Sequence, residues 1–187
     1  MAHVTPIAGR LAVPVAVVLL AAACSSGPTI NTGPLGNGGT QGGICAYLPP
    51  SNPVLTYGII DLHNAGSANA VIENVALVRP RHLRLAAAYV VPITGHQDYG
   101  VWEGYPPVRH QAGVEWSQHQ QAKGARLPPA HSKSDHANLV EVLQPTGPVG
   151  TAQATDIFYR EGRTQYHLRN IYWFKLLVGR ECPGAPD

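Results

Sequence analysis

Charged residues are scarce in this chain. Only 13% of its 187 residues are Asp, Glu, Lys or Arg, and the formal net charge is +2. Proteins that bind nucleic acid through its phosphates usually carry a strong positive field made by clustered Lys and Arg. Arg79, Arg81 and Arg84 do cluster, but three arginines beside a strand are typical of a solvated edge. We therefore expect no nucleic-acid partner and place these arginines on the surface.

Motifs for catalysis are also missing. The sequence has no Gly-x-Ser-x-Gly, no Ser-x-x-Lys and no phosphate-binding glycine loop followed by Lys-Ser or Lys-Thr. Ser117 and His119 are close in sequence, but a nucleophile and its base must meet in space beside a third, orienting group. We expect no enzyme and no cofactor. An unrecognised hydrolase stays open as an alternative, because folding and not spacing assembles catalytic triads.

Apolar runs long enough to cross a membrane are absent as well, and the one sizeable run lies near the N-terminus. It follows Arg10 and extends over 13 residues, from Leu11 to Ala23, whereas a membrane-spanning helix needs about 20 residues. A positive residue, a short apolar run and small residues at its end are typical of a secretory signal peptide. We predict a signal peptide over residues 1–23.

The signal peptide ends in Ala21-Ala22-Ala23-Cys24. This ending resembles the lipobox of bacterial lipoproteins, in which the cysteine is acylated and becomes the mature N-terminus. The resemblance implies that Cys24 carries a lipid that anchors the protein to the outer face of the cell membrane. The alternative is an ordinary secretory peptide cut after Ala23, with Cys24 left as a free thiol.

The segment after the anchor is rich in glycine. Between Ser25 and Gly43 there are seven glycines and two prolines, and the only aliphatic residues are Ile30 and Leu35. So little apolar surface does not offset the entropy of folding. We expect residues 24–43 to be the lipidated cysteine followed by a flexible, disordered tether.

The remaining residues, 44–187, are expected to form one domain whose hydrophobic period is two. From Leu83 to Ile93 the odd positions are apolar, which predicts a half-buried strand. A second alternating run extends from Tyr166 to Val178, with a break expected near Asn170. Gly, Pro and Asn turns separate these runs from the other predicted strands, at 54–62, 71–78, 139–143 and 153–159. The pattern predicts an all-β, antiparallel β-sandwich.

One stretch of the domain is similar to a known pattern. Residues 58–66 end in Asn64-Ala65-Gly66, and the alternating aliphatic residues of 71–77 follow. This arrangement resembles immunoglobulin-like sandwiches of secreted bacterial proteins. The resemblance implies an immunoglobulin-like fold and no particular activity, because such sandwiches carry many functions.

Three cysteines are present, and two of them lie at the ends of the predicted domain. In an oxidising compartment Cys45 and Cys182 are expected to form a disulfide that ties the first strand to the last. Two buried free thiols or a redox pair are the alternatives. The redox alternative has no Cys-x-x-Cys spacing to support it.

Histidine is the one reactive residue type that is abundant. Five histidines lie in a polar stretch that also contains Asp98, Glu115 and Asp135. The nitrogens of the imidazole ring are suitable ligands for zinc or copper(II). The spacings match no metal motif, so solvated loop histidines are the expectation and a metal site is the alternative. The histidines of this stretch are His96, His110, His119, His131 and His136.

Aromatic residues gather in a neighbouring segment. Trp102 and Tyr105 lie beside Gly104 and Pro106, and Trp116 follows. We expect this segment to be a loop, and aromatic residues in such a loop can present a rigid platform to a sugar ring or a partner protein. The alternative is that these aromatics fold over the open end of the sandwich and extend its core.

Together these observations predict a cell-envelope lipoprotein. Its domain is expected to be a non-catalytic binding or structural module that presents residues 95–137 to an envelope protein or a cell-wall glycan. A metal-capturing envelope protein and an unrecognised hydrolase are the alternatives from other functional classes.

Overall fold

The computed structural model describes residues 30–38, 41–93, 98–106, 116–132 and 136–183, and within these ranges the protein is built of strands and their connections. No described segment forms a helix long and apolar enough to cross a membrane. The elements are β1 (Leu35–Gly36), β2 (Gly42–Leu48), β3 (Leu55–Asn64), β4 (Ala70–Val78), β5 (Leu83–Pro92), β6 (Gly100–Glu103), η1 (Trp116–Gln118), β7 (Gln120–Gln121), β8 (Arg126–Leu127), β9 (His136–Pro145), β10 (Val149–Ala152), β11 (Ala154–Glu161), β12 (Thr164–Asn170) and β13 (Tyr172–Val178).

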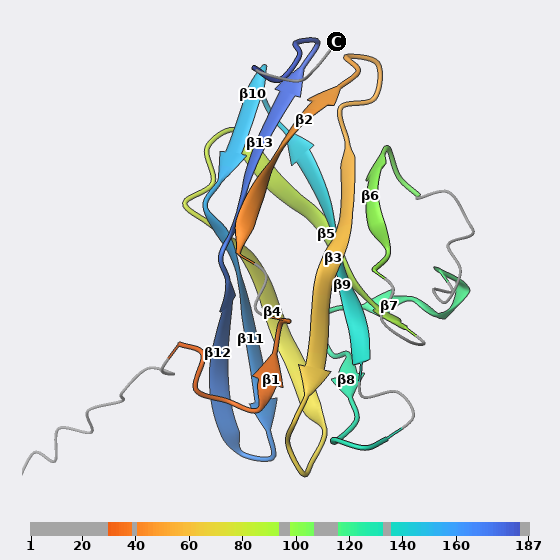
Figure 1. Ribbon diagram of the computed structural model, residues 1–187, viewed down its shortest axis with the longest axis vertical. Coiled ribbons are helices and arrows are strands. Elements are labelled where there is room, and N and C mark those ends of the chain that lie inside the picture. Colours follow the sequence, from red (N-terminus) through yellow and green to blue (C-terminus); the bar gives the residue numbers. More distant parts are fainter. Residues whose placement is uncertain (1–29, 39–40, 94–97, 107–115, 133–135, 184–187) are drawn as a thin grey trace, which may run out of the picture.

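The strands form two layers (Figure 1). The first layer is one sheet in the order β1-β3-β9-β5-β7, with β6 paired to the upper part of β3. The second layer consists of two sheets, β12-β11-β4-β8 and β10-β13-β2. These two sheets continue one another, because β10 leads into β11 at Gln153 and β12 leads into β13 at Ile171. The expected all-β architecture with antiparallel sheets is confirmed, except that β2 pairs in parallel with β13.

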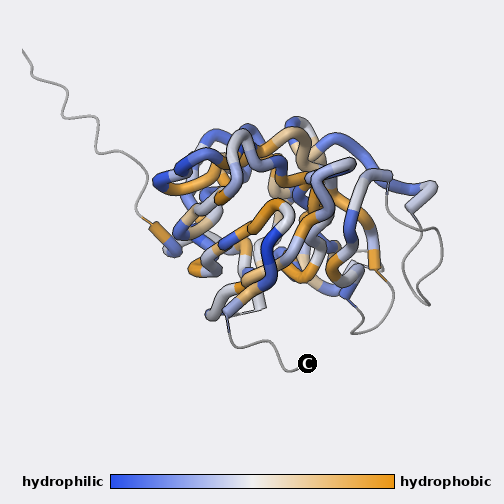
Figure 2. Tube along the Cα trace, turned by 90° about the horizontal axis from the view of Figure 1, so that it is seen from above, coloured by the Kyte–Doolittle hydropathy of each residue, from blue (hydrophilic) through white to orange (hydrophobic). Residues whose placement is uncertain are grey.

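The predicted strands are present as β3, β4, β5, β9, β11, β12 and β13. More and less buried positions alternate along parts of β3 and β11, and the trace coloured by hydropathy shows both hydrophobic and hydrophilic stretches across the sandwich (Figure 2). The break expected near Asn170 lies at Ile171, between β12 and β13. The segment around Trp102, which was expected to be a loop, is instead strand β6 and extends the first layer.

We call the apolar cluster between the two layers the main interior. It holds most of the largest buried side chains, and Tyr57 of β3 packs edge-on against Phe174 of β13 with ring centroids 5.0 Å apart. Burial of such side chains is the dominant stabilising term in folding. Its buried members include Leu48, Leu55, Tyr57, Ile60, Leu62, Ile72, Leu83, Val90, Leu139, Leu143, Ile157, Tyr159, Leu168, Phe174 and Leu176.

A second apolar cluster, which we call the outer cluster, covers the opposite face of the first layer. Successive residues of a strand point to opposite faces, so β5 contributes to both clusters. A register irregularity between Leu85 and Ala87 changes which positions face which cluster: Leu83 and Val90 face the main interior, whereas Tyr89 faces outward. The prediction of a half-buried strand therefore holds for residues 83–86 and is wrong for the end of β5, where both faces are buried. The outer cluster contains Tyr89, Val91, Ile93, Tyr99, Val140 and Val142, with Val54, Ala87, Trp102 and Trp116 packed against it.

The expected disulfide is present. Cys45 in β2 and Cys182 after β13 are bonded, with Cα atoms 6.0 Å apart and a sequence separation of 137. This bond links β2 near the start of the domain to the chain just beyond its last strand. The alternative of two free thiols is wrong for this structure, whereas a redox pair stays an alternative, because its oxidised form is also a disulfide.

The expected tether is wrong over its described part, residues 30–38 and 41–43. Leu35 is 3% exposed and belongs to the main interior, and β1 pairs with β3. Gly33 allows this approach, because a Cβ there would overlap the Tyr159 hydroxyl and the Tyr166 ring. The sandwich therefore begins by Ile30 and not at residue 44. The signal peptide and Cys24 lie outside the described residues.

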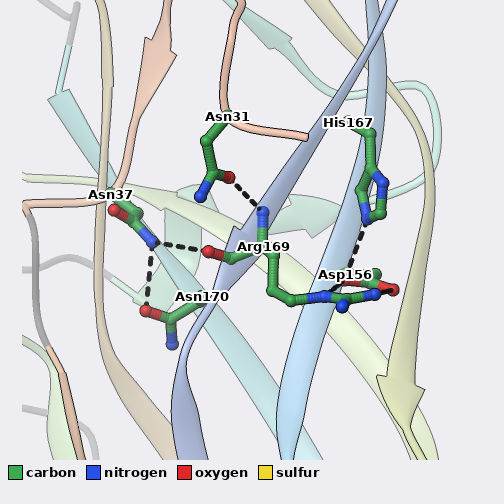
Figure 3. A network of polar contacts seen from close by, with 6 residues as sticks. All are labelled: Asn31, Asn37, Asp156, His167, Arg169 and Asn170. Carbon is green, nitrogen blue, oxygen red and sulfur yellow. Dashed lines mark hydrogen bonds and ion pairs between the residues drawn. The ribbon is translucent and has the colours of Figure 1, made fainter. Parts of the chain in front are cut away.

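Polar contacts also hold this N-terminal segment in place (Figure 3). The backbone N–H of Asn31 donates to the carbonyl of His167 at 2.7 Å, and the Asn31 side-chain oxygen accepts from the N–H of Arg169 at 2.7 Å. The Asn37 amide donates to the side-chain oxygen of Asn170 at 3.2 Å. Hydrogen bonds of asparagine side chains thus supplement the short backbone pairing of this glycine-rich segment. Composition alone does not reveal them.

Candidate functional site

The described aromatic residues of the 98–121 region converge on the outer cluster. Trp116 lies 5.3 Å from Tyr89, 5.5 Å from Tyr99 and 6.1 Å from Tyr105, measured between ring centroids. His119 stacks on Trp116 at 4.3 Å with the two planes 6° apart. Separations of 4.5–7 Å in tilted or edge-on geometry are those at which aromatic rings attract one another. The sequence therefore correctly grouped Tyr105 and Trp116.

Three of these side chains face solvent. Tyr105 is 41% exposed, His119 is exposed and Trp116 is half-buried. We call these three residues the aromatic rim. Their support is buried, since Tyr89 and Tyr99 are almost fully covered. The aromatic rim is consequently the solvent-exposed edge of the outer cluster, whose other aromatic members are buried.

Trp102 does not join the aromatic rim. It is half-buried on β6, and its indole N–H donates to the Tyr99 carbonyl at 2.8 Å. Trp102 therefore packs over the sheet and does not present its ring to a ligand. The platform predicted from Trp102, Tyr105 and Trp116 is thus reduced to its last two members, with His119 added.

Local hydrogen bonds place the aromatic rim. The Gly104 N–H donates to the Val54 carbonyl and the Thr56 hydroxyl donates to the Gly104 carbonyl, both at 2.7 Å, so the end of β6 is fixed to β3 just before Tyr105. The Trp116 carbonyl accepts from the N–H of His119 at 3.0 Å, and His119 Nδ1 lies 2.6 Å from the same oxygen. The 3-10 turn of η1 thereby holds the indole and the imidazole face to face.

Polar groups lie beside the rings of the rim. The Tyr105 hydroxyl donates to the Tyr89 hydroxyl oxygen at 2.7 Å. Burial, together with this hydrogen bond and the charge of Tyr89, raises the pKa of Tyr105 to about 12. Ser117, Gln118 and Gln120 beside the rim are exposed. The described surface therefore combines ring faces with hydroxyl and amide groups.

The histidines predicted as alternative metal ligands are spread over several places. His136 pairs with His63 across β9 and β3 at a ring-centroid distance of 4.4 Å, and its Nδ1 lies 3.4 Å from an Asp61 oxygen. His119 belongs to the rim, and His131 lies in an exposed turn. Among the described residues no group of three or more His, Cys, Asp or Glu is placed to hold a metal ion. His96, His110, Glu115 and Asp135 lie outside the described residues, so metal capture stays a prediction.

A polar network that the sequence did not predict lies on the second layer (Figure 3). Arg169 grips Asp156 with two bonds, Nε at 2.6 Å and Nη2 at 2.8 Å, and His167 Nε2 lies 2.9 Å from the same carboxylate. Burial alone would raise the pKa of Asp156, but the hydrogen bonds and positive charges of Arg169 and His167 outweigh it and lower that pKa. The Asp156 carboxylate thereby ties β11 to β12.

Sequence analysis also missed a cleft of about 440 Å³ on the second layer. It is lined by Arg79, Arg81, Thr151, Ala152, Gln153, Trp173, Phe174 and Lys175. Two of the arginines that were assigned to a solvated edge therefore line a concavity. The only sequence signal was the Arg-Pro-Arg turn, because the residues opposite it are about 70 to 95 positions away along the chain.

The chain matches no protein-family model, and no curated protein is significantly similar to it.

Proposed function

We propose that this protein is a cell-envelope lipoprotein whose β-sandwich is a non-catalytic binding module for cell-wall glycan. The observation that carries the proposal is the aromatic rim, in which Tyr105, Trp116 and His119 face solvent together on a rigid base. Aromatic faces contribute a large contact area at low entropic cost, and sugar rings present apolar C–H faces that stack on them.

The surroundings of the rim favour a sugar over an envelope protein. Exposed Ser117, Gln118 and Gln120 offer hydroxyl and amide groups that match sugar hydroxyls. Stable protein interfaces bury about 800 Å² on each partner and have a large desolvated centre. Three partly exposed rings supported by buried ones give a narrower surface, which suits one or two sugar units.

The anchoring part of the proposal depends on Cys24. Six residue steps separate Cys24 from Ile30, where the sandwich begins, so an extended chain spans about 20 Å at most. A lipid on Cys24 would hold the domain close to the membrane surface, nearer than the longer tether expected from composition. We also propose that the sandwich is immunoglobulin-like. This part of the proposal is supported by the two segments that resemble such sandwiches, because they fall in the consecutive strands β3 and β4 of opposite layers.

A sedimentation assay tests the binding function. Full-length protein in detergent micelles is mixed with insoluble chitin, an uncharged amino-sugar polymer, and the bound fraction is measured. We expect the double variant Tyr105→Ala/Trp116→Ala to bind at least tenfold more weakly. Tyr47→Ala is the matched control, because Tyr47 is 42% exposed, close to the 41% of Tyr105, but lies on β2 in the other layer.

Undiminished chitin binding by the folded double variant would contradict the proposal, as would absence of binding by the wild type. If the protein captured an envelope protein and no glycan, the proposed glycan ligand would be wrong and the envelope protein would be the partner. Mass spectrometry of the protein from bacterial membranes tests the anchor. An acylated Cys24 at the N-terminus is the expected result, and an unmodified terminus would remove the lipoprotein assignment.

A further inference from the structure

The cleft on the second layer has the chemistry of a binding site that is separate from the aromatic rim. It is lined by residues of β10, of β13 and of the connections between β4 and β5 and between β10 and β11. Figure 1 shows β10 and β13 on the left and β6 on the right. Its volume of about 440 Å³ falls within the range of small-ligand pockets. We propose that this cleft binds an acidic sugar unit, a pyranose that carries a carboxylate or a phosphate.

Strand register places the cations of the cleft side by side. Arg81 and Thr151 exchange backbone hydrogen bonds of 2.8 and 2.9 Å, and Thr151 is the register partner of Lys175. Arg81, Thr151 and Lys175 therefore form one row across three chain segments, with a hydroxyl between two positive charges. Guanidinium and ammonium groups in such a row provide several donors to one anionic group.

The next row supplies a third cation and a ring. Arg79 Nη1 donates to the Gln153 side-chain oxygen at 3.5 Å, and the N–H of Gln153 donates to the Val78 carbonyl at 2.9 Å. Trp173 of β13 lines the same cleft. The cleft thus combines three positive charges with one indole, a pairing that suits an anion attached to an apolar ring face.

The Trp173 indole lies flat along the sheet. A Cβ on Gly43 of the neighbouring β2 would overlap the indole, so the ring rests directly on that glycine. Trp173 nevertheless remains 47% exposed, which leaves part of the ring open to solvent. A flat, half-exposed indole supported from below is the arrangement that stacks on a sugar ring.

The described lining of the cleft carries positive charge and no carboxylate: Arg79, Arg81 and Lys175 line it, and none of the lining residues is acidic. Elsewhere on the second layer, Arg169 pairs with Asp156 and Arg160 lies 3.3 Å from Glu73. These two arginines therefore have carboxylate partners, whereas the described lining of the cleft offers its cations none.

The backbone around these arginines is strained. Arg79 and His82 have φ values of 47° and 48°, in the left-handed region that residues other than glycine and asparagine rarely occupy. Such strain costs free energy and persists where the surroundings fix it. A turn selected for stability alone would place asparagine or glycine at position 79, whereas arginine keeps a cation at the mouth of the cleft.

Calorimetric titration of full-length protein in uncharged detergent micelles tests the proposal with defined probes. These are trigalacturonic acid, glucose 6-phosphate, neutral maltotriose and inorganic phosphate. We expect at least one of the two acidic sugars to bind tenfold or more tightly than both maltotriose and phosphate, and its affinity to fall as salt rises. The two acidic probes distinguish a carboxylate from a phosphate.

Variants locate the binding. Arg81→Gln and Lys175→Gln are each expected to weaken the acidic sugar about tenfold, while Arg84→Gln, an exposed arginine outside the cleft, leaves the affinity unchanged. Gly43→Ala displaces the indole without altering charge and is expected to abolish the preference for sugar over phosphate. Arg79→Asn is expected to weaken binding without lowering the melting temperature, which separates loss of the ligand contact from loss of the fold.

Equal affinity for maltotriose or for inorganic phosphate would overturn the proposal, and so would unchanged affinity in Arg81→Gln and Lys175→Gln. The Tyr105→Ala/Trp116→Ala variant is expected to retain the acidic sugar. Failure of the rim proposal and failure of the cleft proposal are therefore distinguishable.

Discussion

The two faces of the first layer are both apolar, yet they are covered in different ways. Leu139 and Leu143 of β9 enter the main interior, where a complete second layer covers them. Val140 and Val142 of the same strand enter the outer cluster, against which Trp102 of β6 and Trp116 of η1 pack. Coverage by a hydrogen-bonded layer fixes a face, whereas coverage by short elements leaves rings such as Tyr105 partly in solvent. The comparison explains why, among the described residues, partly exposed rings gather on only one of these two faces.

The largest effect is expected from the disulfide, which links β2 to the chain after β13 within the second layer. Replacing Cys45 and Cys182 by Ala removes a link across a sequence separation of 137. The chain-entropy model then predicts a loss of about 5 kcal/mol in the free energy of unfolding. Urea denaturation of the double variant measures this loss. A reduction below about 1 kcal/mol would show that the link contributes little, and that packing and strand pairing alone hold the second layer over the main interior.

A pair of truncations compares the two clusters directly. Phe174→Ala in the main interior is expected to cost about 4 kcal/mol, because a large buried ring is replaced by a cavity. Trp116→Ala in the outer cluster is expected to cost about 1–2 kcal/mol, since its ring is already half in solvent. Equilibrium denaturation measures both. Equal losses would mean that the outer cluster is as tightly closed as the main interior.

The contrast also separates what the sequence predicts from what it does not. Alternation correctly located the long strands, because burial of one face leaves a period of two in the sequence. Alternation predicted that β5 buries only one of its faces. The bulge between Leu85 and Ala87 could not be recognised, because the sequence there is a run of Ala and Leu. The prediction of a tether from glycine-rich composition failed for a related reason. Leu35 and the asparagine side chains are stabilised by contacts with residues that are distant in the sequence.

The candidate sites show the same limit. Tyr105 and Trp116 were found because aromatic residues cluster in sequence, whereas Tyr89 and His119, which complete the cluster, come from separate alternating or polar segments. The cleft joins Arg79 and Arg81 to Trp173 and Lys175. That union depends on the pairing of β10 with β13 and on the Arg81–Thr151 bridge, and pairing between distant strands cannot be derived from local periodicity.

The main interior contains a carboxyl group, and this makes its stability depend on pH. Glu141 is fully buried, and its Oε1 accepts from the Thr155 hydroxyl at 2.8 Å, across the two layers. Burial raises the pKa of Glu141 to about 7, despite the opposing effect of the Thr155 hydrogen bond. The folded protein therefore holds this proton more tightly than the unfolded chain, whose pKa is near 4.5.

From this difference we predict that stability falls as pH rises from about 4.5 to about 7, with a total loss of about 3 kcal/mol. Glu141→Gln cannot ionise, so it should match the wild type near pH 4.5 and exceed its stability by about that amount at pH 8. Denaturation at both pH values measures the difference. Glu103→Gln, an exposed glutamate on β6, serves as the control and should leave the pH dependence of the wild type intact. A pH profile unchanged by Glu141→Gln would assign the dependence to other groups.

The smallest effect is expected at the outer edge of the outer cluster. Tyr105→Phe removes the hydroxyl that donates to Tyr89 while keeping the ring, and a partly exposed hydrogen bond of this kind contributes about 1 kcal/mol or less. Stability should therefore change little, and stacking of the ring on a sugar should persist. If chitin binding nevertheless fell as far as in Tyr105→Ala/Trp116→Ala, the hydroxyl itself would be the recognition group. The ring face would then serve only to position it, and the outer cluster would act through a polar contact.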